Sequence, residues 1–217
     1  MAETALNALT PIAQSPIAVV GPTSVVSGWL VSGRQTQADL TLTDLTPLTK
    51  VAVRADPAGR MAEALTESLK GHEGSMLVTS VVPGDWLVIA EAGEQAGVVA
   101  WLESAGAAEF ATVVDLTHGR AMLRLTGRQA SEVLAKECAV DLSDRGCADG
   151  RALRTGVAGL AVDVVRNDRA GVPSYLMHCE RSSGQYLFDA LLDAGTELGI
   201  DVDGFRPPGL STAEGAS

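Results

Sequence analysis

The pattern of hydrophobic and polar positions divides the chain into a short irregular start and a long regular body. In residues 1–36, proline and glycine interrupt short apolar runs, and neither a helical nor a strand period is kept for long. From residue 37 onward, alternating apolar and polar residues typical of half-buried strands take turns with segments of helical period. We therefore expect an extended N-terminal arm over residues 1–36 and a single domain over residues 37–203. Residues 204–217, rich in proline, glycine and serine, are expected to form a flexible tail that contributes little to the core.

Within the body, the same order of elements is predicted twice: strand, helix, strand, strand, helix. The expected helices cover residues 58–71, 94–106, 128–142 and 183–200. The two copies also share residues, because the triplet that begins at Asp44 returns at Asp115, and Leu65 corresponds to Leu134. We predict two pseudo-repeated βαββα units, about residues 40–106 and 111–203, that form one compact α+β domain with mostly antiparallel sheet.

The composition supports a globular protein with an acidic surface. The chain has 217 residues, is 46% hydrophobic and carries a formal net charge of -11, which argues against binding nucleic acid or an anionic membrane surface. Proline and glycine interrupt every apolar stretch before it is long enough to span a membrane. The start lacks the basic region of a secretory signal, so we expect a cytoplasmic protein. Three cysteines without a CxxC pair predict free thiols and neither a disulfide nor a metal framework: Cys138, Cys147 and Cys179.

Common signatures of dinucleotide, phosphate, zinc and hydrolase sites are missing from the sequence. It contains no GxGxxG after a strand, no GxxxxGK[ST], no HExxH and no GxSxG. We therefore expect no catalytic, cofactor-binding or metal-binding residue on this chain. The remaining candidates are single polar residues in or beside predicted strands.

His118 is the first of these candidates, because it follows a predicted strand and lies two residues before Arg120. As a general base it would need a group that orients its imidazole. Asp115 is near in sequence, but in an extended segment the two side chains point to opposite faces. The first copy has Pro47 at the equivalent position, so the fold does not require an imidazole there. We interpret His118 as a structural residue at a strand entrance, with general-base chemistry as the alternative.

Three arginines form a short basic run in this acidic chain: Arg120, Arg124 and Arg128. In an alternating strand, Arg120 and Arg124 share one face with Met122, and we interpret that face as solvated. The alternatives are an inter-subunit salt bridge or a bidentate grip on a carboxylate or phosphate.

Two further candidates lie in the later strands. His178 and Cys179 are adjacent, so they face opposite sides of a strand and the imidazole cannot activate the thiol. Asp163 lies among apolar neighbours and must either find a partner or face solvent, and we expect it to face solvent. We assign the tryptophans to core or interface positions: Trp29, Trp86 and Trp101.

The segment VVDLTHGRAMLRLTGRQASEVLAKECAVDL, residues 113–142, resembles the hallmark segment of the folate-binding aminomethyltransferase superfamily, typified by the T protein of the glycine cleavage system. The residues that match the pattern are Asp115, Leu116, Thr117, His118, Gly127 and Asp141. The resemblance covers roughly residues 38–203 and implies the folate-binding domain fold of that superfamily. In its folate-handling members a carboxylate pair lies in a strand after a Gly-Gly turn. AGLAVDVV, residues 158–165, offers only Asp163, so independent folate chemistry is not expected.

The segments LTDLTPLTKVAVRA, residues 42–55, and VPSYLMHCERSSGQYLFDALL, residues 172–192, look closer still to the gamma-subunit family of heterotetrameric sarcosine oxidases. This resemblance implies a non-catalytic subunit of a complex that demethylates sarcosine to glycine, passing the methyl carbon to tetrahydrofolate and electrons to oxygen. It places NAD and tetrahydrofolate on the alpha subunit, FAD on beta, FMN between them and zinc on delta. The alternatives are a gamma-type subunit of a sibling complex for another N-methylated amine or amino acid, and a stand-alone folate-binding protein.

Overall fold

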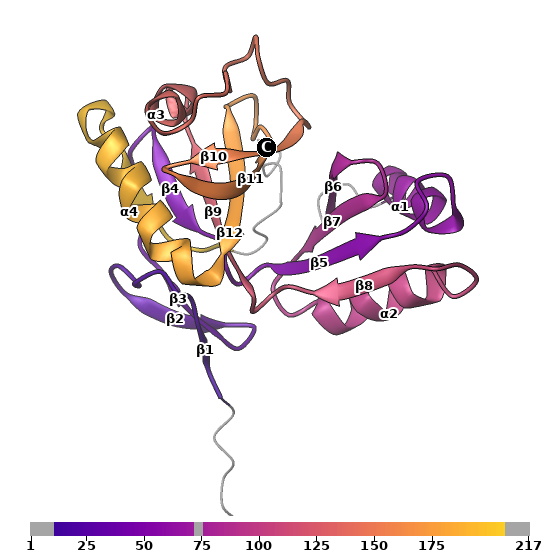
Figure 1. Cartoon of the computed structure of the whole chain (residues 1–217). Helices are drawn as coiled ribbons and strands as arrows, with labels where there is room; N and C mark the ends of the chain where they lie inside the picture. Colours follow the sequence, from indigo (N-terminus) through magenta and orange to yellow (C-terminus); the bar gives the residue numbers. More distant parts are fainter. Residues whose placement is uncertain (1–10, 72–75, 207–217) are drawn as a thin grey trace, which may run out of the picture.

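The computed structural model describes residues 11–71 and 76–206, and its regular elements follow the predicted order from β4 to α4 (Figure 1). The strands are β1 (Ala13–Gln14), β2 (Thr23–Val26), β3 (Trp29–Ser32), β4 (Thr41–Asp44), β5 (Thr49–Arg54), β6 (Met76–Val82), β7 (Asp85–Ala90), β8 (Thr112–Asp115), β9 (Arg120–Thr126), β10 (Ala152–Val157), β11 (Leu160–Arg166), β12 (Ser174–Glu180) and β13 (Asp201–Asp203). The helices are α1 (Arg60–Gly71), α2 (Gln95–Ala105), α3 (Ala130–Glu137) and α4 (Gly184–Gly195).

Helix α3 ends earlier than its predicted range of 128–142. Cys138 is already extended, and the Asp141 carboxylate accepts a hydrogen bond from the backbone N–H of Ser143 at 3.0 Å. Such a local bond from an aspartate side chain competes with helical hydrogen bonding. The turn around Asp141 therefore replaces the last helical turn that the periodicity predicts.

Two antiparallel sheets form the body of the molecule. The larger has the strand order β10-β11-β12-β9-β4-β13, and the smaller has the order β6-β7-β5-β8. Within these two sheets, only β13 and β4 pair in parallel. Helices α3 and α4 pack on the larger sheet, and α1 and α2 pack on the smaller one (Figure 1). The predicted α+β class with mostly antiparallel sheet is confirmed.

The chain passes from one sheet to the other at two corners. Strand β4 lies in the larger sheet and its continuation β5 in the smaller one. At the corner between them, the Asp44 carboxylate accepts from the N–H of Thr46 at 2.9 Å. The Thr46 hydroxyl accepts from the N–H of Met122 at 3.2 Å, and the N–H of Leu45 donates to the Met122 carbonyl at 2.8 Å. Two side chains therefore supply the hydrogen bonds that a straight strand would have made with its neighbour.

The second corner has the same set of bonds in the opposite direction, from β8 in the smaller sheet to β9 in the larger one. The Asp115 carboxylate accepts from the N–H of Thr117 at 2.8 Å. The Thr117 hydroxyl accepts from the N–H of Lys50 at 3.1 Å, and the N–H of Leu116 donates to the Lys50 carbonyl at 2.7 Å. The internal repeat stays a prediction, and it is supported by these corners and by the strand order β6-β7-β5-β8, which parallels β11-β12-β9-β4.

The arm contains more regular structure than its sequence pattern predicts. Strands β2 and β3 form a hairpin, and β1 pairs in parallel with β3. The hairpin turns at Ser27 and Gly28, which have φ angles of 47° and 79°, the conformation of a tight two-residue turn between twisted strands. The Ser-Gly dipeptide between two apolar runs is a local turn signal, which the periodicity alone does not include.

A central core joins the arm to the body. Trp29 of β3 is 1% exposed and packs in one core with Leu48 of the first corner, Ile89 of the smaller sheet and Leu176 of the larger sheet. Phe205, from the segment expected to contribute little, belongs to the same core. The remaining tail, residues 207–217, and the first ten residues of the arm lie outside the described residues. The boundaries of arm, domain and tail therefore stay predictions.

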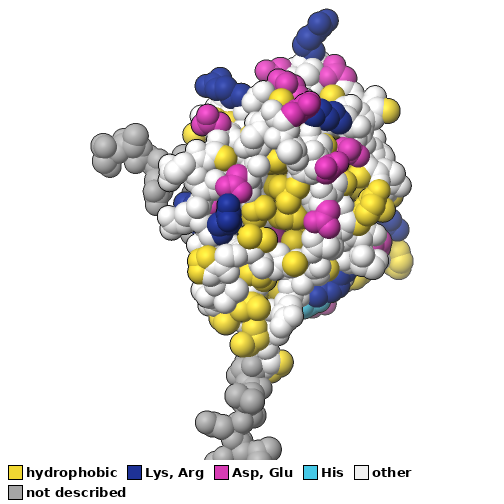
Figure 2. All heavy atoms as spheres, turned by 90° about the vertical axis from the view of Figure 1, so that its left-hand side faces the viewer, with side chains coloured by type: hydrophobic (Ala, Val, Ile, Leu, Met, Phe, Trp, Pro, Cys, Tyr) yellow, Lys and Arg dark blue, Asp and Glu magenta, His cyan; other side chains and the backbone are white. Residues whose placement is uncertain are grey.

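The outer face that carries α4 is mixed in character. Acidic side chains are scattered over it, with hydrophobic side chains exposed between them and along the arm below (Figure 2). Within the part of the chain that the structure describes, no helix is long and apolar enough to cross a membrane.

Candidate functional site

A cleft between the two sheets brings several of the candidate residues together. It encloses about 260 Å³. Strands β5, β6 and β7 of the smaller sheet supply one wall, including Trp86 and the valines Val81 and Val82. Strands β9 to β12 of the larger sheet supply the polar groups of the other wall: Arg120, Arg154, Asp163 and His178. Of the tryptophans, Trp86 lines this cleft and is half-buried.

The most strongly held pair in the cleft is Arg154 with Asp163. Nε of Arg154 lies 2.6 Å from Oδ1 of Asp163, and Nη2 lies 3.1 Å from Oδ2, so the contact is bidentate. Asp163 is 8% exposed, and the expectation that it faces solvent is wrong. The two residues face each other across the β10–β11 hairpin. Its turn, Ala158-Gly159, fixes this register, so the sequence contained a signal for the partner of Asp163.

His178 is the third polar group at this point. Its Nε2 lies 3.4 Å from Oδ2 of Asp163, and its Nδ1 is buried without a hydrogen-bond partner among the described residues. Burial lowers the pKa of His178 to about 4, although the charge of Asp163 acts in the opposite direction. The imidazole is therefore neutral near pH 7, and its geometry favours the tautomer that carries the proton on Nε2, facing the carboxylate. In this tautomer, Nδ1 is a hydrogen-bond acceptor.

Arg120 lies at the rim of the same cleft and is paired as well. Its Nη1 is 2.7 Å from Oε1 of Glu180, the residue directly opposite on β12. This side chain thus takes part in an intramolecular ion pair. The inter-subunit salt bridge stays a prediction. The two arginines of the cleft are thus each paired with a carboxylate, Arg154 with Asp163 and Arg120 with Glu180. Both pairs join neighbouring strands of the larger sheet, and Asp85 of the opposite wall pairs with Arg54 at 3.2 Å.

His118 lies outside the cleft. It is exposed, and its ring stacks on that of Trp29 with a centroid distance of 4.7 Å and an interplanar angle of 11°. The Asp115 carboxylate is engaged in the corner with Thr117, so it does not orient the imidazole. The structure favours the structural interpretation of His118, as a cover for the arm tryptophan at the entrance of β9.

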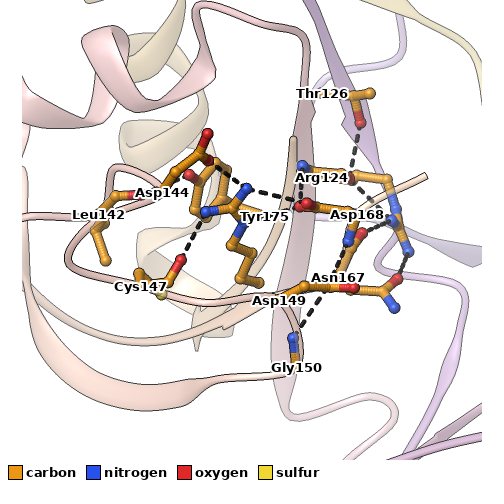
Figure 3. A network of polar contacts seen from close by, with 12 residues as sticks. Arg124, Thr126, Leu142, Asp144, Cys147, Asp149, Gly150, Asn167, Asp168 and Tyr175 are labelled. Carbon is orange, nitrogen blue, oxygen red and sulfur yellow. Dashed lines mark hydrogen bonds and ion pairs between the residues drawn. The ribbon is translucent and has the colours of Figure 1, made fainter. Parts of the chain in front are cut away.

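Among the candidate residues, Arg124 differs most from its expected position on a solvated strand face. The face that it shares with Met122 is not solvated, because Arg124 is 5% exposed and Met122 is fully buried. The Arg124 guanidinium donates to Oγ of Ser174 at 3.0 Å and to Oδ1 of Asn167 at 3.1 Å (Figure 3). Arg128, by contrast, is exposed. Strand alternation assigned the face correctly, but it cannot show that the β11–β12 loop covers it.

A buried arginine that sequence reasoning missed organises the neighbouring network. Arg166 is 5% exposed, and it bonds Asp168 at 2.9 Å and Asp144 at 2.6 Å. It also donates to the Cys147 carbonyl at 2.6 Å, and its guanidinium carbon lies 5.8 Å from the ring centre of Tyr175. The network ties the long α3–β10 loop to β11 and β12 (Figure 3). Its only sequence signal is a charged residue at the end of an apolar strand.

The cysteines are free and buried: Cys138, Cys147 and Cys179. Cys179 packs in the core under the helices, on the opposite side of β12 from His178, so the predicted separation of this pair is confirmed. Burial raises the pKa of Cys179 to about 11, which leaves the thiol protonated and unreactive. Within the described residues, no group of three or more His, Cys, Asp or Glu side chains could hold a metal ion.

Comparisons with known proteins match this architecture to one family. A model of the GCVT N-terminal domain matches residues 65–208. The gamma subunit of sarcosine oxidase from Arthrobacter sp is 30% identical over 174 residues, which cover 75% of this chain and 83% of that subunit. The chain belongs to the sarcosine oxidase gamma-subunit family. A second member of the family, from Corynebacterium sp. strain P-1, is 31% identical over the same share of each chain.

More distant relatives share the domain or the fold. Human mitochondrial dimethylglycine dehydrogenase is 23% identical over 186 residues, and the match spans 22% of that much longer protein. A chain of heterotetrameric sarcosine oxidase from Corynebacterium sp. U-96 superposes with a TM-score of 0.66 at 24% identity, over 77% of this chain and 90% of that one. Aminomethyltransferase T of the glycine cleavage system from Bartonella henselae also gives a TM-score of 0.66, at 17% identity, over 84% of this chain and 55% of that one. The gamma-subunit family thus has the aminomethyltransferase folate-binding fold.

Proposed function

We propose that this chain is a structural subunit of a heterotetrameric sarcosine oxidase and performs no chemistry of its own. The observation that carries the proposal is the extent of the match, which spans 83% of the Arthrobacter gamma subunit. A match over most of a subunit transfers the role of that subunit, whereas a match to one domain of a larger enzyme transfers only the fold. The charges of the inter-sheet cleft support this role, because they pair with one another: Arg154 with Asp163, and Arg120 with Glu180.

The complex would demethylate sarcosine oxidatively to glycine, pass the methyl carbon to tetrahydrofolate and deliver electrons to oxygen. In this proposal the alpha, beta and delta subunits hold FAD, FMN, NAD, tetrahydrofolate and zinc, and the assembly is cytoplasmic. The chain would serve as a scaffold on which those subunits are positioned. Its acidic charge of -11 and the hydrophobic side chains exposed beside α4 (Figure 2) suit contacts with other proteins.

Co-expression with the three partner chains tests the proposal. We expect the four chains to co-purify and to consume oxygen with sarcosine, faster than with N,N-dimethylglycine. We expect the isolated chain to retain no flavin and to leave sarcosine unchanged. The proposal is wrong if the isolated chain oxidises sarcosine, or if the partner chains assemble and reach full activity without it.

A second experiment uses a folate analogue. A ligand of the native state raises the melting temperature as its concentration exceeds the dissociation constant. We expect no shift for the isolated chain with a saturating folate analogue, because Asp163 is engaged by Arg154. A concentration-dependent rise would favour a folate-binding protein over a scaffold.

A further inference from the structure

A second hollow lies on the larger sheet and is lined by arginines and threonines. Strands β4 and β9 are neighbours there, and their register places Thr41 opposite Thr126 and Thr43 opposite Arg124. Strand alternation puts these four side chains on one face, while the intervening leucines fill the core under α3 and α4. The hollow encloses about 240 Å³, and Arg169 and Arg206 complete its lining with Asp203.

The cationic groups reach this hollow from three separate segments. Arg124 rises from β9 and is 5% exposed, with its guanidinium held by Ser174 and Asn167 (Figure 3). Arg169 comes from the β11–β12 loop, and Arg206 follows β13, where its Nη2 lies 3.0 Å from Oδ1 of Asp203. Three arginines and one aspartate thus belong to the lining, and Glu91 acts on Arg169 from nearby. Arg124 is fixed in place, as a preformed binding group needs to be.

The cationic groups of the hollow outnumber the carboxylates that act on them, with three arginines against Asp203 and Glu91. Burial, and then the nearby charge of Arg169, lower the pKa of Arg124 to about 9. Burial also lowers the pKa of Arg169, although Glu91 acts in the opposite direction. A bound anion would reverse both shifts, because an opposite charge favours the protonated guanidinium. In a chain with a net charge of -11, this local surplus is not a property of the surface in general.

We propose that this hollow binds a phosphate group, either free phosphate or the phosphate of a small metabolite. A planar carboxylate is satisfied by one arginine in bidentate contact, whereas a tetrahedral oxyanion uses donors from several directions. The hollow offers the second arrangement, with threonine hydroxyls on the β4–β9 floor and guanidinium groups from the loop and from the segment after β13. This binding site is independent of the scaffold role and does not require the partner subunits.

Calorimetric titration of the full chain with inorganic phosphate, at constant ionic strength, tests the inference. Phosphate should bind, and acetate should bind far more weakly. Arg169→Gln should weaken phosphate binding by about tenfold or more, since a charge-assisted hydrogen bond is lost. Arg145→Gln, an exposed arginine outside the hollow, should bind like the parent chain. Thr43→Val, which keeps the charge, should weaken binding to a smaller extent.

The proposal fails if the parent chain gives no binding isotherm with phosphate, or if acetate binds as tightly. It also fails if Arg169→Gln and Thr43→Val, with circular dichroism spectra like that of the parent, both keep its affinity. Glycerol phosphate identifies the source of the group. Tighter binding than inorganic phosphate indicates a phosphorylated metabolite, and equal binding indicates free phosphate; both results support the site.

Discussion

The two corners at which the chain changes sheets share their hydrogen bonds and differ in their surroundings. Asp44 is half-buried, and burial raises the pKa of its carboxyl, whereas Asp115 is exposed. The residue after the triplet is a buried proline at position 47 and an exposed histidine at position 118. The comparison teaches that the Asp-Leu-Thr triplet encodes the turn itself. The residue that follows the triplet can differ, so a turn of this kind does not require the histidine.

The two corners also differ in the residue of the neighbouring strand with which they form hydrogen bonds. At the second corner it is Lys50, which is fully buried, and at the first it is Met122. Nζ of Lys50 donates to the carbonyls of Thr46 and Leu48 at 2.7 and 2.6 Å. Burial lowers the pKa of Lys50 to about 7, although Asp44 raises it. The fold tolerates an apolar side chain at one of these places and a costly buried ammonium at the other.

Truncation of Trp29 should have the largest effect, because this side chain covers the second corner and anchors the arm in the central core. We expect Trp29→Ala to lower the free energy of unfolding by about 3–5 kcal/mol, the usual loss for a large aromatic residue. Urea denaturation measures it. His118→Ala is the matched control, since it removes only the exposed partner of the stack and should cost about 1 kcal/mol or less. Equal losses would contradict this expectation, because they would show that the arm depends on the histidine as much as on the tryptophan.

Replacement of Lys50 by methionine, the residue at the equivalent position of the other corner, should change how the free energy of unfolding depends on pH. Between about pH 7 and pH 10.5, Lys50 is protonated in the unfolded chain but deprotonated in the folded chain. This lysine therefore makes the parent protein more stable as the pH rises through that window. Lys50→Met removes this dependence and should stabilise the protein near neutral pH by about 1–4 kcal/mol, as apolar replacements of buried charges often do. The advantage should shrink near pH 10; an advantage that does not change with pH contradicts the buried-charge explanation.

Loss of a corner hydroxyl should have the smallest effect, and the same effect at both corners. Thr46→Val and Thr117→Val each leave a buried strand N–H without its acceptor, which costs about 1–3 kcal/mol. Thr66→Val on the exposed face of α1 is the control and should change the free energy of unfolding by about 0.5 kcal/mol or less. Thermal or urea unfolding of the three variants measures the difference. A loss at only one corner would show that the two turns are not energetically equivalent.

Periodicity predicted the helices and strands from β4 to α4, because strand and helix patterns are local, but it missed the three strands of the arm. The same reasoning separated His178 from Cys179, since it needs only the alternation of one strand. It failed for Asp163 and Arg124, because burial of a polar strand residue depends on which distant segment covers it. For Asp163 the covering residue was within reach of local reasoning, through the turn of the β10–β11 hairpin. For Arg124 the covering loop and its partners come from a part of the chain more than 40 positions away.

The exchange of strands at the corners makes the two sheets one mechanical unit. A force that pulled the smaller sheet away would travel along the backbone through both corners and into strands β4 and β9. The smaller sheet is one uninterrupted segment, from β5 to β8, and it is joined to the larger sheet at both of its ends. Tension between the two sheets is therefore carried by covalent backbone at both ends of the smaller sheet, in addition to the hydrogen bonds of the corners.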